Sequence, residues 1–200
     1  MIQSEPFPAV PALFRQSNPV SAPVDSDAAL LVAARSMNRE ALAKIFDLHS
    51  RRLYNYALRL CHDPLTADHV VGDVFAKFLD QLSLGHGPLT NLRAYLYEIA
   101  YHLIVDEVRY SQRIFALECM DAYQWDEFSF QSLENRLTFE KVMHAIQTAL
   151  TKDQQHVIVL RFLEGMSLQE TAAIVGKSVN HVKVIQNRAI DSLRKALDGR

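Results

Sequence analysis

Apolar residues recur at three- and four-residue intervals in every long segment of this 200-residue chain. That spacing places them on one face of an α-helix, and no segment keeps the strict apolar and polar alternation of a half-buried strand. The cleanest example runs from Val70 to Leu82. We therefore predict an all-α fold built from amphipathic helices.

Capping residues and prolines mark the expected helix ends. Proline disfavours helix at the residue before it, so Asp63-Pro64 should stop a long helix that starts near Asn38. Ser, Thr, Asp and Asn cap helix starts because their oxygens accept backbone N–H groups of the first turn. The other expected starts are Ser26 or Asp27, Thr66, Thr90 or Asn91, and Thr151, which caps a helix from Lys152 to Leu163. The inner stripe of the long helix should hold Leu42, Ile45, Phe46, Leu53, Tyr56, Ala57 and Leu60.

Charge is distributed unevenly along the chain. The net charge is only -2, yet residues 136–200 carry ten Lys and Arg against six Asp and Glu. Residues 26–113 carry ten of each sign, and residues 114–135 carry five acids and no Lys or Arg. A chain of this length can bury two small cores. We predict two small helical domains, residues 26–113 and 134–200, joined by an acidic linker, residues 114–133, after a flexible Pro-rich tail, residues 1–25.

Three features bear on where the chain works. Its first 25 residues lack the basic start and apolar core of a signal peptide. No apolar run approaches the roughly 20 residues that a membrane helix needs. Cys61 and Cys119 form no CxxC pair, which argues against a disulfide scaffold or a cysteine zinc site. We expect a cytoplasmic protein without membrane insertion.

The strongest local signal is a helix-turn-helix pattern between residues 165 and 183. Ser167 and Glu170 have the spacing of a capping box, which fixes a helix start. Gly176 suits the left-handed residue that ends this helix, and Ser178 can cap the next one. In such motifs the second helix lies in the major groove of DNA, and its exposed residues reach bases and phosphates. The candidate DNA-binding residues are Lys177, Ser178, Asn180, His181, Lys183, Val184, Asn187 and Arg188.

Two stretches resemble the obligatory domains of sigma-70 family transcription initiation factors. Leu160 to Leu197, LRFLEGMSLQETAAIVGKSVNHVKVIQNRAIDSLRKAL, is similar to the domain that reads the minus-thirty-five promoter element. Ala67 to Leu79, ADHVVGDVFAKFL, with Asn91 to Arg109, NLRAYLYEIAYHLIVDEVR, is similar to the domain that docks on RNA polymerase and opens the minus-ten element. The order and spacing of the two stretches resemble the extracytoplasmic-function (ECF) subgroup.

The resemblance implies a function and partners. It implies a sigma factor that binds core RNA polymerase and promoter DNA, and it leaves open whether an anti-sigma factor holds the two domains. It assigns core binding to Asp68, His69, Gly72 and Asp73. It assigns minus-ten contacts to Tyr97, Tyr101, His102, Arg109 and Arg113.

The chain departs from the family pattern at several of these positions. His69 and Gly72 stand where an acid and a glutamine are usual, and Ile185 stands where arginine is common. Glu98 and His102 lower the positive charge of the helix that would meet minus-ten DNA. Because phosphate contacts supply much of the affinity for DNA, we expect weak minus-ten binding without polymerase.

Other classes of function have less support in the sequence. The eight histidines show no HxxxH or HExxH spacing with a carboxylate, so we expect no bound metal. Nucleotide-binding and esterase motifs are missing, so we expect neither an enzyme nor a cofactor. A stand-alone helix-turn-helix regulator remains the alternative. Residues 26–113 distinguish it from a sigma factor, because a regulator would need a dimer interface or a ligand pocket in this segment, whereas the segment resembles a polymerase-docking domain. An anti-sigma or other interaction module would not need Lys183 and Arg188.

Overall fold

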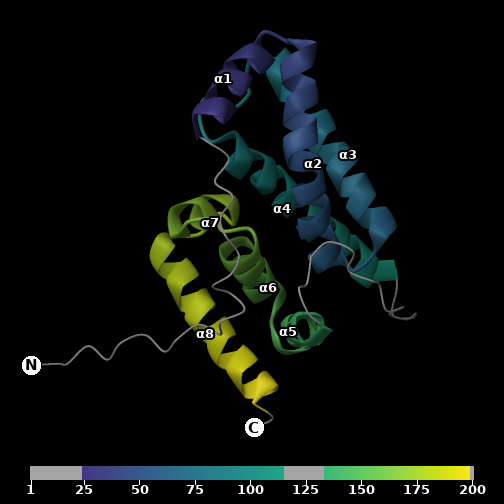
Figure 1. Ribbon diagram of the computed structural model, residues 1–200, viewed down its shortest axis with the longest axis vertical. Helices are drawn as coiled ribbons and strands as arrows, with labels where there is room; N and C mark the ends of the chain where they lie inside the picture. Colours follow the sequence, from purple (N-terminus) through teal and green to yellow (C-terminus); the bar gives the residue numbers. More distant parts are fainter. Residues whose placement is uncertain (1–23, 115–132, 199–200) are drawn as a thin grey trace, which may run out of the picture.

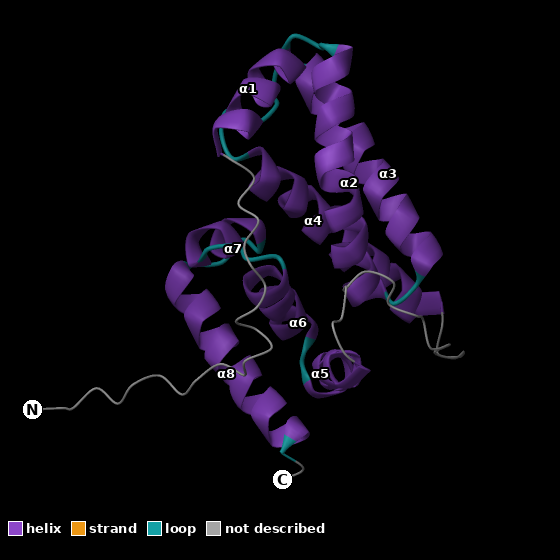
Figure 2. Cartoon of the chain, viewed as in Figure 1, coloured by secondary structure: helices purple, strands orange, loops and turns teal. Residues whose placement is uncertain are grey.

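The computed structural model describes residues 24–114 and 133–198, and its regular elements in that part of the chain are all helices (Figures 1 and 2). The expectation of an all-α fold is therefore confirmed. The cluster of Trp125, Phe128 and Phe130 in the expected linker lies outside the described residues.

Four helices form a first unit, drawn from purple to teal in Figure 1. They are α1 (Val24–Arg35), α2 (Arg39–Cys61), α3 (Pro64–Ser83) and α4 (Leu92–Ile114). The long helices α2 and α3 lie side by side, and α4 packs against both of them. Their apolar stripes meet in a core that contains Ile45, Tyr56, Phe78 and Leu96, each almost fully buried.

The helix starts in this unit differ in part from those expected. Asn38 caps α2 as predicted, with its side-chain oxygen accepting from the Ala41 N–H at 2.9 Å. Thr66 was the expected cap of α3, but Asp63 takes that role and accepts from the Thr66 N–H at 2.7 Å. Pro64 then fills the first helical position, where its missing N–H costs no hydrogen bond. Helix α1 begins at Val24, so the expected caps Ser26 and Asp27 lie inside it.

One member of the predicted inner stripe of α2 points outward. Phe46 is 47% exposed, although its neighbour Ile45 is fully buried. The Phe46 ring lies against Phe75 of α3, with centroids 4.8 Å apart. Leu79, one helical turn further along α3, is also exposed. The inner stripes are therefore narrower than the sequence pattern suggests, and an apolar surface remains on this side of α2 and α3.

A second unit is drawn from green to yellow in Figure 1. It contains α5 (Leu133–Ala149), α6 (Lys152–Ile158), α7 (Leu168–Ile174) and α8 (Val179–Leu197), and a π-helical turn, Val159–Leu163, extends α6. Thr151 caps α6 as predicted, in a capping box with Gln154. Helices α5, α6 and α8 share a small core around Met143, Ile158 and Leu193.

The two units pack against each other through α4 and α7. One apolar cluster runs from the first unit into the second, where it includes Val157, Leu160 and Met166. Figure 1 shows α6 and α7 next to the lower half of the first unit. The side of α4 that faces the second unit is consequently a buried surface in this structure.

Candidate nucleic-acid interface

Local hydrogen bonds fix the helix-turn-helix in the way the sequence predicts. The Ser167 Oγ accepts from the Glu170 N–H at 3.1 Å, and the Glu170 carboxylate accepts from the Ser167 N–H at 2.8 Å. Gly176 has φ +63, a left-handed conformation that glycine adopts without strain. Ser178 then caps α8 by accepting from the His181 N–H at 3.2 Å. These four residues fix where α7 begins, the turn that follows it and where α8 begins.

Helix α8 presents one polar face to solvent. Val182, Ala189 and Leu193 are buried against the rest of the unit, as predicted. The opposite face exposes Asn180, His181, Lys183, Val184, Asn187 and Arg188, together with the capping Ser178. The structure therefore brings these predicted DNA-binding residues together on one accessible surface. This surface offers amide groups that can pair with base edges and cations that can hold phosphates.

Two further observations qualify this surface. Lys177, at the turn before α8, is half-buried and forms an ion pair with Asp153 at 3.1 Å. Ile185 is buried in the core, and the Gln186 Oε1 accepts from the Arg161 Nε at 3.1 Å. Ile185, the departure from the family pattern, and Gln186 beside it thus serve the packing of the second unit. They do not belong to its exposed face.

The predicted minus-ten residues are spread over two sides of α4. Tyr97 is fully buried and Tyr101 is half-buried, both against the second unit. His102 is exposed to solvent. Arg109 and Arg113 lie in the last turns of α4, and the described side chains do not include them. Among the three described side chains, the structure therefore does not bring Tyr97, Tyr101 and His102 onto one exposed surface.

A buried carboxylate joins the two units. Glu164, which follows the π-helical turn, accepts from the Arg59 Nη1 at 2.7 Å through Oε1. Its Oε2 accepts from the Tyr97 hydroxyl at 2.5 Å. The Arg59 and Glu164 side chains are only 7% and 6% exposed, so this ion pair is shielded from water. Burial, reinforced by the Glu164 charge, raises the pKa of Tyr97 well above its ordinary value, which keeps the hydroxyl protonated as a donor.

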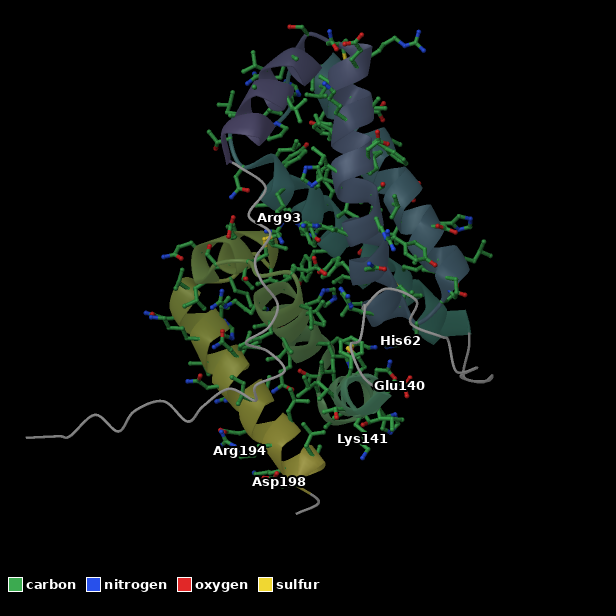
Figure 3. The ribbon with its side chains drawn as sticks, viewed as in Figure 1. His62, Arg93, Glu140, Lys141, Arg194 and Asp198 are labelled. Atoms are coloured by element: carbon green, nitrogen blue, oxygen red, sulfur yellow. The ribbon has the colours of Figure 1, made fainter. Side chains whose placement is uncertain are left out.

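Arg93 closes this cluster at its outer edge. Its guanidinium donates to the Glu164 carbonyl oxygen and lies over the Tyr97 ring, 5.7 Å from the centroid. Figure 3 shows Arg93 where α4 approaches α7. The side chains of Arg59, Arg93 and Tyr97 therefore surround one residue of the second unit with donors. We call Arg59, Arg93, Tyr97 and Glu164 the Glu164 cluster.

A second buried contact lies beside the Glu164 cluster. The Tyr56 hydroxyl and the His156 Nδ1 are 2.8 Å apart, and the Tyr101 and His156 ring centroids are 4.8 Å apart. Burial lowers the pKa of His156 to about 4, while Asp153 opposes this shift and Lys152 adds to it. Burial also raises the pKa of Tyr56. At neutral pH the imidazole is therefore uncharged, and its Nδ1 can accept a hydrogen bond from the Tyr56 hydroxyl.

Exposed hydrogen bonds flank both buried contacts. The Asn91 amide donates to Glu170 at 2.9 Å, which links the start of α4 to the capping box of α7. Burial opposes ionisation of Glu170, but hydrogen bonds from Ser167 and Asn91 lower its pKa on balance. At the far end, Gln147 of α5 contacts the ring of His62 at 3.0 Å. Sequence analysis missed this whole junction, because Arg59 and Glu164 lie 105 positions apart and no spacing pattern connects them.

The candidate core-binding residues lie on the outer side of α3. Asp68, His69, Gly72 and Asp73 are all exposed. No atom comes within 4 Å of a Cβ built on Gly72, so the surface there is open. The apolar side chains of Phe46 on α2 and Leu79 on α3 are exposed as well. Sequence analysis placed Phe46 on the inner stripe of its helix.

Within residues 24–114 and 133–198, no group of three His, Cys, Asp or Glu side chains is arranged to hold a metal ion. Among the same residues, no helix combines the length and apolar character required to cross a membrane.

Comparison with known proteins identifies both units. Residues 45–114 match the family model for sigma-70 region 2, and residues 148–195 match that for sigma-70 region 4. The chain belongs to the sigma-70 family of RNA polymerase sigma factors. Its relatives place it in the ECF group. It is similar to the ECF sigma factor BldN of Streptomyces coelicolor, with 27% identity over 86% of this chain and 68% of BldN. It is also similar to SigX of Bacillus subtilis, with 26% identity over 80% of this chain and 84% of SigX.

Solved structures agree with this assignment. CnrH, solved in complex with the cytosolic domain of CnrY, matches with a TM-score of 0.67 and 27% identity over 88% of this chain and 99% of CnrH. The sigma factor RpoE of Bartonella quintana, solved with the anti-sigma factor NepR, shares the fold with a TM-score of 0.62. Its identity is 21%, over 78% of this chain and 96% of the RpoE chain. The protein is thus a non-enzymatic sigma factor that directs transcription initiation and binds RNA polymerase and DNA.

Proposed function

We propose that this sigma factor reads the minus-thirty-five element with the exposed face of α8. The observation that carries the proposal is the collection of Asn180, Lys183, Asn187 and Arg188 on that single accessible face. Asparagine can bond bidentately to adenine, and lysine can bond to guanine, so these side chains supply sequence readout. Arg188 and Lys177 supply phosphate contacts, with Lys177 leaving its ion pair with Asp153 to do so.

The first unit takes the other two roles in this proposal. The exposed side of α3, with Asp68, His69, Gly72 and Asp73, docks on core polymerase. Charged groups at such a surface steer association and set its register. Helix α4 meets the minus-ten element with Tyr97, Tyr101, His102, Arg109 and Arg113, where aromatic side chains can stack on unpaired bases beside positive charge. We also retain the proposed domain boundaries, residues 26–113 and 134–200.

A protein regulator and a compartment complete the proposal. CnrH, the relative with 27% identity, was solved with the cytosolic domain of CnrY bound. By analogy we propose that a protein of the anti-sigma class binds this chain. We place the activity in the cytoplasm, because core polymerase and promoter DNA meet there.

Promoter-specific initiation with purified core polymerase tests the α8 assignment. Lys183→Ala with Arg188→Ala removes one proposed base contact and one proposed phosphate contact, and together they should weaken promoter binding by about 1–3 kcal/mol, or about 5- to 150-fold. Lys141→Ala is the matched control, because Lys141 is an exposed cation on α5, away from the α8 face (Figure 3). Equal activity of the double variant and the control would reject the α8 assignment.

The same assay decides between this function and the stand-alone regulator. A sigma factor on its own should bind promoter DNA weakly and direct initiation once core polymerase is added. Tight, specific binding of duplex DNA by the free protein, with no effect of added core, would favour a regulator.

A further inference from the structure

One apolar side chain lies on the polar face of α8. Val184 is 46% exposed, and Asn180 and Arg188 lie one helical turn before and after it. Lys183 and Asn187 beside it are exposed as well. Residues four positions apart share one side of a helix, so Val184 lies in the middle of the face that is proposed to read DNA. Single exposed apolar residues are common on protein surfaces, so the position of Val184, rather than its exposure, indicates a role.

The packing of the second unit does not use this valine. Helix α8 buries Val182, Ala189 and Leu193, and Ile185 next to Val184 is buried too. Within residues 24–114 and 133–198, neither of the two apolar clusters includes Val184. The methyl groups of Val184 are therefore available to a partner of α8.

The residues that follow Val184 fix the direction of its side chain. Ile185 is buried, and the Gln186 Oε1 accepts from the Arg161 Nε at 3.1 Å. The Arg161 guanidinium also donates to the Met166 carbonyl oxygen, which ties this turn of α8 to the loop before α7. Helix α8 therefore cannot rotate about its axis without breaking these contacts. Because valine has one strongly preferred rotamer in a helix, its two methyl groups are held in place as well.

The major groove of DNA offers one apolar group to such a side chain. The base edges there present hydrogen-bond donors and acceptors, except for the C5-methyl group of thymine. Asn180 and Lys183 can use the donors and acceptors, but the side chain of Val184 has no polar atom with which to do so. Contact between methyl groups removes both from water and needs no hydrogen-bond partner. Of the four bases, thymine is therefore the one that fits Val184.

We propose that Val184 is a specificity-determining residue that recognises the C5-methyl group of one thymine in the minus-thirty-five element. This inference rests on the proposed function, because it requires α8 to lie in the major groove. Side chains one turn apart on a helix are about 5–6 Å apart, and stacked base pairs are about 3.4 Å apart. The thymine therefore lies within about two base pairs of the base that Asn180 reads.

Uracil in place of thymine tests the methyl contact, because it removes the methyl group and leaves base pairing unchanged. Each thymine of the minus-thirty-five element is replaced in turn, and promoter binding by the full-length protein with core polymerase is measured. At one position, uracil should weaken binding by the parent protein about 3- to 5-fold, as expected for one buried methyl group. Val184→Ala should bind the two promoters equally. Val184→Ile keeps a branched apolar side chain and should retain the preference for thymine.

Val32→Ala is the matched control, because Val32 is 70% exposed and lies on α1, far along the chain from α8. It should show the same preference for thymine as the parent. Circular dichroism verifies that each variant keeps its helices. The inference is overturned if no single uracil weakens binding by the parent. It is also overturned if the same uracil weakens binding by Val184→Ala as much as binding by the parent.

The double variant with Lys183→Ala and Arg188→Ala separates this inference from the proposed function. If the double variant binds promoters weakly but no uracil affects the parent, α8 reads DNA without a methyl contact, and only the role of Val184 is refuted. If the double variant binds like the parent and no uracil has an effect, the assignment of α8 to DNA fails, and the role of Val184 fails with it.

Discussion

Helices α8 and α4 are both assigned to promoter DNA, yet the rest of the protein treats them in opposite ways. Helix α8 buries one stripe within its own unit and leaves its polar face open. Helix α4 buries Tyr97 against a carboxylate that belongs to the other unit. The comparison shows that two surfaces proposed to bind one promoter differ in access: the face of α8 is exposed, whereas Tyr97 of α4 is buried at the junction of the two units.

The largest loss of unfolding free energy should come from removing one charge of the Arg59–Glu164 ion pair. Arg59→Gln or Glu164→Gln alone leaves one buried charge without its partner, which typically costs about 3–5 kcal/mol. The double variant leaves neither charge of this pair buried. Its loss of unfolding free energy should therefore be smaller than the sum of the two single losses by about 0.5–3 kcal/mol. Urea unfolding of the four proteins measures this coupling. Strict additivity would mean that the two side chains do not act together.

Acid should weaken the junction through His156. The pKa of His156 is about 4 in the folded protein, against 6.5 in water. As pH falls, the unfolded state therefore takes up a proton at a higher pH than the folded state does. The stability that depends on neutral His156 is present above about pH 6.5 and is lost as pH falls towards 4. Between pH 7 and pH 5 the loss should be about 2 kcal/mol.

Unfolding measurements across this range, made in parallel on His156→Gln, isolate the effect of His156. The variant has no imidazole at this position, so its stability should fall less between pH 7 and pH 5 than that of the parent. An equally steep fall in both proteins would show that another group controls the acid response.

Substitutions on α8 should separate base readout from phosphate contact. Arg188→Ala should weaken binding of the polymerase complex to all promoters and reduce the salt dependence by about one phosphate contact. Asn180→Ala should instead relax the preference at one base position. Salt titrations and promoter libraries measure the two effects. Identical behaviour of the two variants would contradict the division of roles on this face.

The smallest of these effects should come from the cap of α7. Ser167→Ala removes the oxygen that accepts from the Glu170 N–H and should cost about 1 kcal/mol of stability. Ser167→Asp keeps an acceptor at the cap and is the matched control. Thermal unfolding compares them, and the alanine variant should have the lower midpoint. A midpoint for the alanine variant equal to that of the parent would show that the cap contributes no measurable stability.

Sequence analysis predicted the features that depend on residues close together in the chain. The capping box of Ser167, the left-handed Gly176 and the cap Ser178 were all predicted, because each depends on residues a few positions away. Periodicity also gave the exposed face of α8. It misplaced Phe46, because an apolar residue at the edge of a stripe can face solvent or the core.

The junction could not be predicted in this way. Arg59 lies among apolar neighbours in α2, and Glu164 follows the π-helical turn, so each taken alone looks unremarkable in sequence. Their pairing depends on how two separately patterned units pack, which is a tertiary property. Tertiary packing likewise buries Tyr97, which contacts both Tyr56 and Glu164, while His102 of the same helix is exposed.

Hydroxyl-radical footprinting of the free protein tests the contrast between α4 and α8 most directly. The account predicts that Tyr97 is protected and His181 is oxidised in the parent protein. In Glu164→Gln, oxidation of Tyr97 should rise several-fold while that of His181 stays constant. Rapid oxidation of Tyr97 in the parent, equal to that in the variant, would contradict the burial of Tyr97 against Glu164 at the junction of the two units.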